Sequence, residues 1–150
     1  MFKRLLADGA KQGVILAAAT ATTVAAADYL ENGAAWGAIN SISHIVDGDR
    51  KEYGSTFSPR DSAIGLGINS FAMLVWGIIY IVLFGRLSMP KSLAAASLIT
   101  GGAYVLDYHL VPKQYTPGIE KKISKKAIFF TYVVMAATLA LSPAINRRKK

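Results

Sequence analysis

The stretch SAIGLGINSFAMLVWGIIYIVLFG, residues 62–85, contains no charged residue over 24 positions. A helix needs about 20 mostly apolar residues to cross a lipid bilayer. A helix on the surface of a soluble protein would instead carry a polar face with a polar residue on nearly every turn. Residues 62–85 are therefore predicted to form a membrane-spanning helix.

Three further stretches have the same character: residues 13–30, 92–110 and 127–145. Hydrophobic residues make up 53% of the chain and charged residues 17%, against roughly 25% charged in a typical soluble domain. Mean hydropathy is +0.35. The sequence thus predicts an all-α fold, an integral membrane four-helix bundle that forms a single membrane domain over residues 1–150.

The first stretch has a second interpretation, as a signal peptide cleaved near Ala27, because it combines a basic start with an alanine-rich centre. Asp8 and Lys11 lie unusually deep for the leading region of such a peptide. We therefore expect a retained span.

Charges on either side of the spans predict the orientation, because basic residues are enriched on the cytoplasmic side. With the N-terminus inside, the cytoplasmic set is Lys3, Arg4, Lys11, Arg86, Lys91, Arg147, Arg148, Lys149 and Lys150. Basic residues divide almost evenly between the two sides, but Asp8 is the only acidic residue expected inside. Both termini are predicted to be cytoplasmic, with the KKISKK run, residues 121–126, outside.

The net charge of +8 and the absence of cysteine exclude several classes of function. Without cysteine there are no disulfides, thiolate zinc sites or cysteine-ligated iron–sulfur clusters. The basic residues flank apolar runs, as topology-setting and lipid-contacting residues do, so a nucleic-acid partner is not expected. No hydrolase, zinc-protease, P-loop or dinucleotide-binding motif is present, which favours a protein that is not an enzyme and leaves the question open.

The first outer loop, residues 31–61, begins with a pattern typical of a short amphipathic helix. At 100° per residue, Trp36, Ile39, Ile42, Ile45 and Val46 share one half of the helix, and Asn40, His44 and Asp47 share the other. Such a helix would lie in the membrane interface or fold against the bundle.

Ionisable residues near the ends of spans are candidates for function because they are costly inside a bilayer. The candidate ligand residues are Asp28, Asn40, His44, Asp47, Asp107 and His109. The topology brings all of them toward the outer face, where two histidines and two aspartates could bind a divalent metal or a small ligand. Asp107 and His109 point about 200° apart on a helix, so both can face one site only if the helix unwinds before Pro112.

Two alternatives compete with the metal site. Asp28–Tyr29 and Asp107–His109 also fit the belts of tyrosine and polar residues that lie at headgroup level. A haem held by His44 and His109 is a further possibility.

Small residues every four positions predict close helix packing. They are Gly13, Ala17, Ala21 and Ala25 in the first span, and Ser97 and Gly101 in the third. Asn69 in the second span is expected to form a hydrogen bond between helices.

Two stretches, GAAWGAINSISHIVDGD (residues 33–49) and VPKQYTPGIEKKISKK (residues 111–126), resemble segments of an uncharacterised family of small bacterial inner-membrane proteins with four spans. No function is assigned to that family. The resemblance implies a location in the bacterial inner membrane and importance for Asn40, His44, Glu120 and residues 116–118.

The many packing features and the absence of catalytic motifs favour an accessory or assembly protein. Its partners would be the bilayer and either another membrane protein or a second copy of this chain. The alternative function is metal or small-ligand binding at the outer face. A second alternative is a small proton-coupled oligomeric transporter that uses the carboxylate of Asp28.

Overall fold

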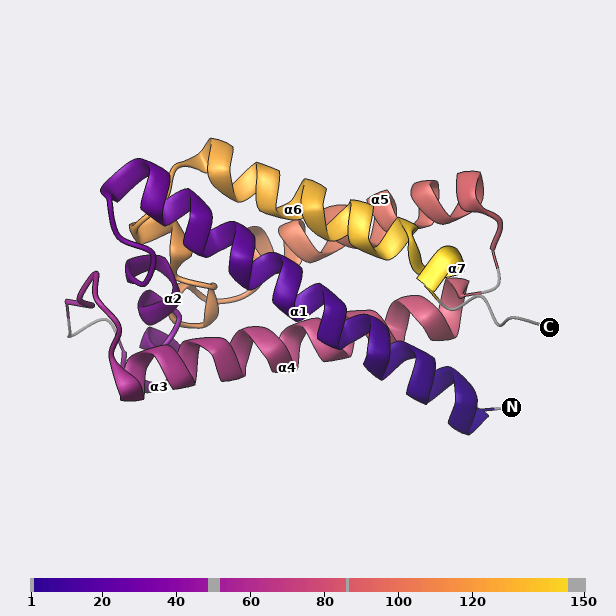
Figure 1. The fold of residues 1–150 in the computed structure, drawn as a ribbon, viewed down its shortest axis with the longest axis horizontal. Coiled ribbons are helices and arrows are strands. Elements are labelled where there is room, and N and C mark those ends of the chain that lie inside the picture. The colour runs from indigo at the N-terminus through magenta and orange to yellow at the C-terminus, as the bar shows by residue number, and fades with distance from the viewer. Residues whose placement is uncertain (1, 49–51, 86, 146–150) are drawn as a thin grey trace.

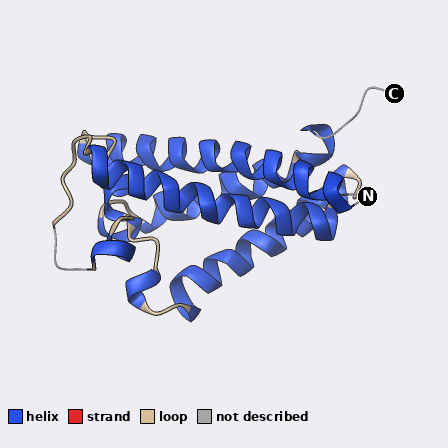
Figure 2. Cartoon of the chain, turned by 90° about the horizontal axis from the view of Figure 1, so that it is seen from below, coloured by secondary structure: helices blue, strands red, loops and turns tan. Residues whose placement is uncertain are grey.

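The computed structural model describes residues 2–48, 52–85 and 87–145. Expectations for Arg50, Lys51, Arg86 and the basic tail at residues 147–150 lie outside the described residues. In the described ranges every regular element is a helix and there is no strand (Figure 2). The prediction of an all-α fold is confirmed.

Four long helices form the body of the molecule (Figure 1). They are α1 (Phe2–Asn32), α4 (Pro59–Phe84), α5 (Met89–Val105) and α6 (Lys125–Ala140). α1 packs along both α4 and α6, and α5 packs along α6. Successive long helices run in opposite directions, so the start of α1 lies at the same end as α7 (Ser142–Ile145).

Two of the long helices begin where the sequence supplies a capping residue. Ser58 precedes α4, and its side chain accepts a hydrogen bond from the backbone N–H of Asp61, with Pro59 in the first turn. Ser124 precedes α6 and accepts in the same way from Ala127. Proline in the first helical turn removes only a donor that has no partner within the helix, so these starts are encoded locally.

α1 and α4 are long and apolar enough to cross a membrane, judged by length and composition. α5 has 17 residues and α6 has 16, fewer than the roughly 20 that a span requires. The described residues thus contain two such helices where four spans were predicted. The first predicted span lies wholly inside α1, which continues without a break from Phe2 to Asn32.

Two segments fold over one end of the bundle, and we call them the cap: residues 33–48 and 111–124. The first contains α2 (Gly37–Ser41) and α3 (His44–Asp47), and the second contains two 3-10 helices, η2 (Lys113–Tyr115) and η3 (Ile119–Lys121). The single amphipathic helix predicted here is in fact two short helices. Asn40 and His44, which the pattern placed on a polar half, are buried. Gly118 in the second segment of the cap lies against His44, and Asn40 is enclosed by the loop at residues 54–56 and by Ser62.

The cap also joins the first long helix to the last. The carboxylate of Glu31 accepts hydrogen bonds from the backbone N–H and the hydroxyl of Ser124, at 2.7 and 2.6 Å. The amide of Asn32 donates to the carbonyl oxygen of Lys122 at 2.7 Å. These bonds fix the end of α1 to the start of α6, and we call them the α1–α6 latch.

Many outward surfaces of the long helices are apolar, while polar side chains lie inside. Leu98, Phe71 and Phe129 are each about 70% exposed, whereas Gln12 and Ser92 are fully buried. Two apolar clusters fill the interior, one around Leu16 and Tyr80 and the other beneath the cap. Large apolar residues on the outside of the long helices differ from the polar outer face that helices of a soluble bundle carry.

Candidate functional site

Asp28 is buried at the end of α1 and closes the start of α2. Its carboxylate accepts the backbone N–H of Ala38 and the side-chain amide of Asn32, both at 2.8 Å. Gly37 lies directly against the carboxylate, because a Cβ there would come within 3.0 Å of Oδ2. Carboxylates near the first turn of a helix satisfy its free N–H groups. This geometry favours a structural role for Asp28.

Asn40 is fully buried and holds the loop after the cap against α4. Its amide donates to the carbonyl oxygens of Gly54 and Thr56, both at 2.8 Å. Its side-chain oxygen accepts from the hydroxyl of Ser62 at 2.7 Å. Both ends of the amide are thus used by the protein itself.

His44 packs against the tight turn at residues 116–118. A Cβ at Gly118 would lie 3.2 Å from two atoms of the imidazole ring. The hydroxyl of Ser41 donates to the carbonyl oxygen of Gly118 at 3.0 Å, and Thr116 donates to Glu120 at 2.9 Å. The two stretches that carried the family resemblance are therefore in direct contact, and together they build the cap.

Asp47 forms an ion pair with Arg60 on the surface of the cap end. The two guanidinium nitrogens lie 2.6 and 2.7 Å from the two carboxylate oxygens. The hydrogen bonds to Asp47 raise the pKa of Arg60 above its ordinary value. Arg60 is 59% exposed, so the pair is screened by solvent and contributes little stability.

Asp107 and His109 point to different places. α5 continues into η1 (Leu106–Leu110), a turn of π-helix in which the N–H of Val111 bonds to the carbonyl oxygen of Leu106 at 3.0 Å. Asp107 turns inward and accepts a hydrogen bond from the hydroxyl of Tyr132 at 2.6 Å. His109 is exposed and rests edge-on against Tyr104. π-Turns are rare and occur frequently at functional sites.

The predicted cluster of Asp28, His44, Asp107 and His109 is not assembled. Each of these side chains has its own surroundings, and the two histidines do not share a site. Among the residues that the structure describes, no three His, Cys, Asp or Glu side chains are placed to hold a metal ion. The physical reason is that the chain stays helical to Leu110, so Asp107 and His109 keep pointing in different directions, and that His44 is buried under Gly118.

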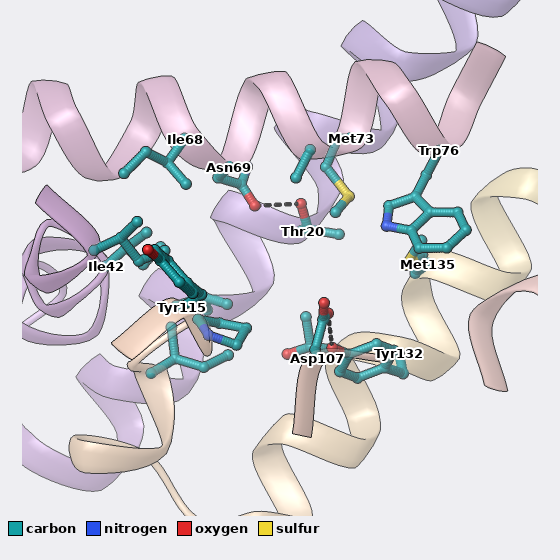
Figure 3. Close-up of a pocket in the computed structure, with 16 residues that line it drawn as sticks. Thr20, Ile42, Ile68, Asn69, Met73, Trp76, Asp107, Tyr115, Tyr132 and Met135 are labelled. Carbon is teal, nitrogen blue, oxygen red and sulfur yellow. Dashed lines mark hydrogen bonds between the residues drawn. The ribbon is translucent and has the colours of Figure 1, made fainter. Parts of the chain in front are cut away.

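Asp107 instead lines a partly open cavity of about 190 Å³. The cavity lies where the two apolar clusters meet, between α1, α4, α6 and the cap (Figure 3). Its walls are mostly aliphatic, aromatic and methionine side chains, with a few polar groups. The lining residues are Thr20, Val24, Ile42, Ile45, Ile68, Asn69, Ala72, Met73, Trp76, Asp107, Tyr115, Pro117, Ile119, Thr131, Tyr132 and Met135.

Polar groups enter the cavity from two sides. On the side of α1 and α4, the hydroxyl of Thr20 donates to the side-chain oxygen of Asn69 at 3.2 Å, and the Asn69 amide donates to the carbonyl of Ala17. Across from them lies the Asp107–Tyr132 pair. A largely apolar pocket with a few convergent polar groups is the usual form of a small-molecule site.

The residues predicted for helix packing fall into two groups. Gly13 and Ala17 are buried, and Gly13 faces α4 so closely that a Cβ on Gly77 would come within 2.5 Å of its nitrogen. Ala21 and Ala25 are half-buried. Ser97 and Gly101 are exposed on the outside of α5, and no atom of another element lies near Gly101.

Sequence reasoning missed Tyr132, Trp76 and Thr20 as cavity residues. A tyrosine in the middle of a predicted span was a usable signal, since a buried hydroxyl needs a partner. Thr20 had no such signal, because its hydroxyl also bonds the carbonyl of its own helix at Leu16. Comparison of the chain with models of protein families, with characterised proteins and with solved structures finds no significant match.

Proposed function

We propose that this chain is a multi-pass membrane protein that binds a small, mostly apolar ligand in the cavity between α1, α4, α6 and the cap. The observation that carries the proposal is the cavity itself, at about 190 Å³. An apolar cavity of roughly 150 Å³ in a protein interior is large enough to hold benzene. The site thus has room for a ligand of about one aromatic ring with a short substituent.

The membrane location is supported by the distribution of side chains over all four long helices. α5 and α6 expose large apolar residues, among them Leu93, Leu98 and Phe130, as α4 does at Phe71. α5 also continues into η1 as helical backbone to Leu110, close to the length of a span. We propose four spans with the cap outside and both termini in the cytoplasm, and the basic residues near the other end, such as Lys3 and Lys91, support this orientation.

A bacterial inner membrane is part of the proposal and is supported by the resemblance of residues 33–49 and 111–126. Contact between these two stretches in the cap gives their shared pattern a structural basis.

The cavity is tested by filling it. Ala72 lies in its wall, so Ala72→Phe should place a ring inside. Purified full-length protein in detergent is titrated with fluorobenzene, and binding is measured by ¹⁹F NMR. The unmodified protein should bind fluorobenzene saturably at one site, and Ala72→Phe should abolish this binding. Ala94→Phe is the matched control, because Ala94 is exposed on α5, and it should bind as the unmodified protein does. If Ala72→Phe and Ala94→Phe bind fluorobenzene with the same affinity, the proposal is refuted.

A second candidate is the accessory or assembly role, and the exposed Ser97 and Gly101 favour it. They lie in a shallow surface groove between α5 and α6, flanked by Tyr104 and Phe129. Small residues that face outward allow a helix of another chain to approach closely. Gly101→Leu should break such an association, which cross-linking between copies that carry Ser97→Cys measures in native membranes. If these copies cross-link equally well with and without Gly101→Leu, the assembly role loses its support.

A further inference from the structure

The cavity holds a carboxylate but no positive charge. Asp107 is half-buried and lies in the wall of the cavity. None of the sixteen lining side chains is lysine, arginine or histidine. A carboxylate removed from water is costly unless a counter-charge or several hydrogen bonds compensate it. Tyr132 supplies one hydrogen bond, which leaves the charge without a cationic partner in the cavity wall.

The other walls suit the body of an organic cation. Trp76 on α4 and Tyr132 on α6 present aromatic rings, and Asp107 enters from η1 (Figure 3). Aromatic faces attract ammonium groups, most strongly where water is excluded. Met73 and Met135 complete an apolar and adaptable wall.

The geometry points to a small organic amine in its ammonium form as the class of ligand. Its charge pairs with Asp107, and its apolar part lies against Trp76 and the two methionines. This inference rests on the proposed ligand cavity and adds the charge of the ligand to it. Tyr132 acts as a positioning residue, because its hydroxyl holds the carboxylate at 2.6 Å in the orientation that faces the cavity.

Three size-matched probes test the charge: benzylamine, benzyl alcohol and benzoate, each titrated against the full-length protein in neutral detergent. The chain has two tryptophans, and Trp36 packs edge-to-face against Phe57 and does not line the cavity. A Trp36→Phe background therefore makes the fluorescence of Trp76 the readout. A charge-assisted contact is roughly twice as strong as a neutral one, so benzylamine should bind at least about tenfold more tightly than benzyl alcohol, and benzoate should not bind.

Asp107→Asn keeps the shape of the side chain and should bring the ratio of benzylamine to benzyl alcohol affinity close to one. Asp47→Asn, which removes a carboxylate outside the cavity, should leave the ratio unchanged. Equal affinity of the two probes for the unmodified protein would overturn the inference even if Asp107→Asn fails to fold.

The outcomes separate this inference from the cavity proposal. If both probes bind equally and Ala72→Phe blocks both, the cavity stands and the cationic ligand falls. If no probe changes the fluorescence of Trp76, and fluorobenzene also fails to bind, both fall together.

Discussion

Replacing Gly77 by alanine is expected to destabilise the bundle, because α1 and α4 touch at this residue through their backbones. A Cβ at Gly77 would lie 2.5 Å from the nitrogen of Gly13, 2.6 Å from its Cα and 2.8 Å from the carbonyl oxygen of Gly9. Real Cβ atoms do not approach backbone atoms so closely, and backbone cannot rotate away as a side chain can. The two helices would have to separate along their most extensive contact.

The size of the effect follows from two opposing contributions. Forced overpacking costs about 1–3 kcal/mol, and the rigid backbone on the other side places Gly77→Ala near the upper end. Alanine in place of a helical glycine returns roughly 1 kcal/mol. The net loss in the free energy of unfolding should be about 2 kcal/mol.

Gly67 provides the matched control on the same helix. No atom lies within 4 Å of a Cβ built there, so Gly67→Ala should gain up to about 1 kcal/mol from helix propensity alone. Reversible unfolding in mixed micelles of a mild detergent and dodecyl sulfate, followed by circular dichroism, measures both variants. If Gly77→Ala is as stable as Gly67→Ala, the close approach of α1 and α4 is refuted.

Three further predictions concern the cap end. Gly118→Ala should lower the stability more than Gly33→Ala does. Both glycines have a positive φ, but a Cβ at Gly118 would also lie 2.8 Å from the cap backbone, whereas the space around Gly33 is open. Unfolding of the two variants, measured in parallel, checks this. Asn40→Ala should cost at least about 2 kcal/mol, since several buried polar partners lose their bonds, and wild-type stability would contradict the network. The hydrogen bonds from Ser124 lower the pKa of Glu31 from its ordinary 4.5. The ionised carboxylate therefore stabilises the fold above pH 4.5, and this contribution is lost as the pH falls through the lowered pKa. Glu31→Gln should remove this loss of stability in acid, and melting curves that depend on pH in the same way for both proteins would contradict the prediction.

Local signals account for what was predicted well. The uncharged run at residues 62–85 corresponds to α4 at Pro59–Phe84, because length and the absence of charge are properties of a single segment. The start of α4 is just as local, with Ser58 as cap and Pro59 in the first turn. The start of α6 at Ser124 depends on the same kind of residue.

The parts of the site that were not predicted depend on geometry or on distant contacts. The π-turn at Leu106–Leu110 stands where a regular α-helix was expected, and no residue of this segment signals it in the sequence. His44 has a polar position in its own segment, yet it is buried by Gly118, far away in the chain. The lining of the cavity comes from seven elements, and no pattern within one element can reveal where they meet.

The α1–α6 latch has a consequence for how the protein is made. Glu31 and Ser124 are separated by 93 positions, so the ribosome completes the first helix long before the residue that fixes its end has been synthesised. The wall that carries Tyr132 and Met135 arrives at the same late stage. Packing of the last helix is therefore the step that completes the cavity, and a nascent chain that stops before Ser124 leaves the buried amide of Gln12 without the carbonyl oxygen of Thr138 that accepts its hydrogen bond.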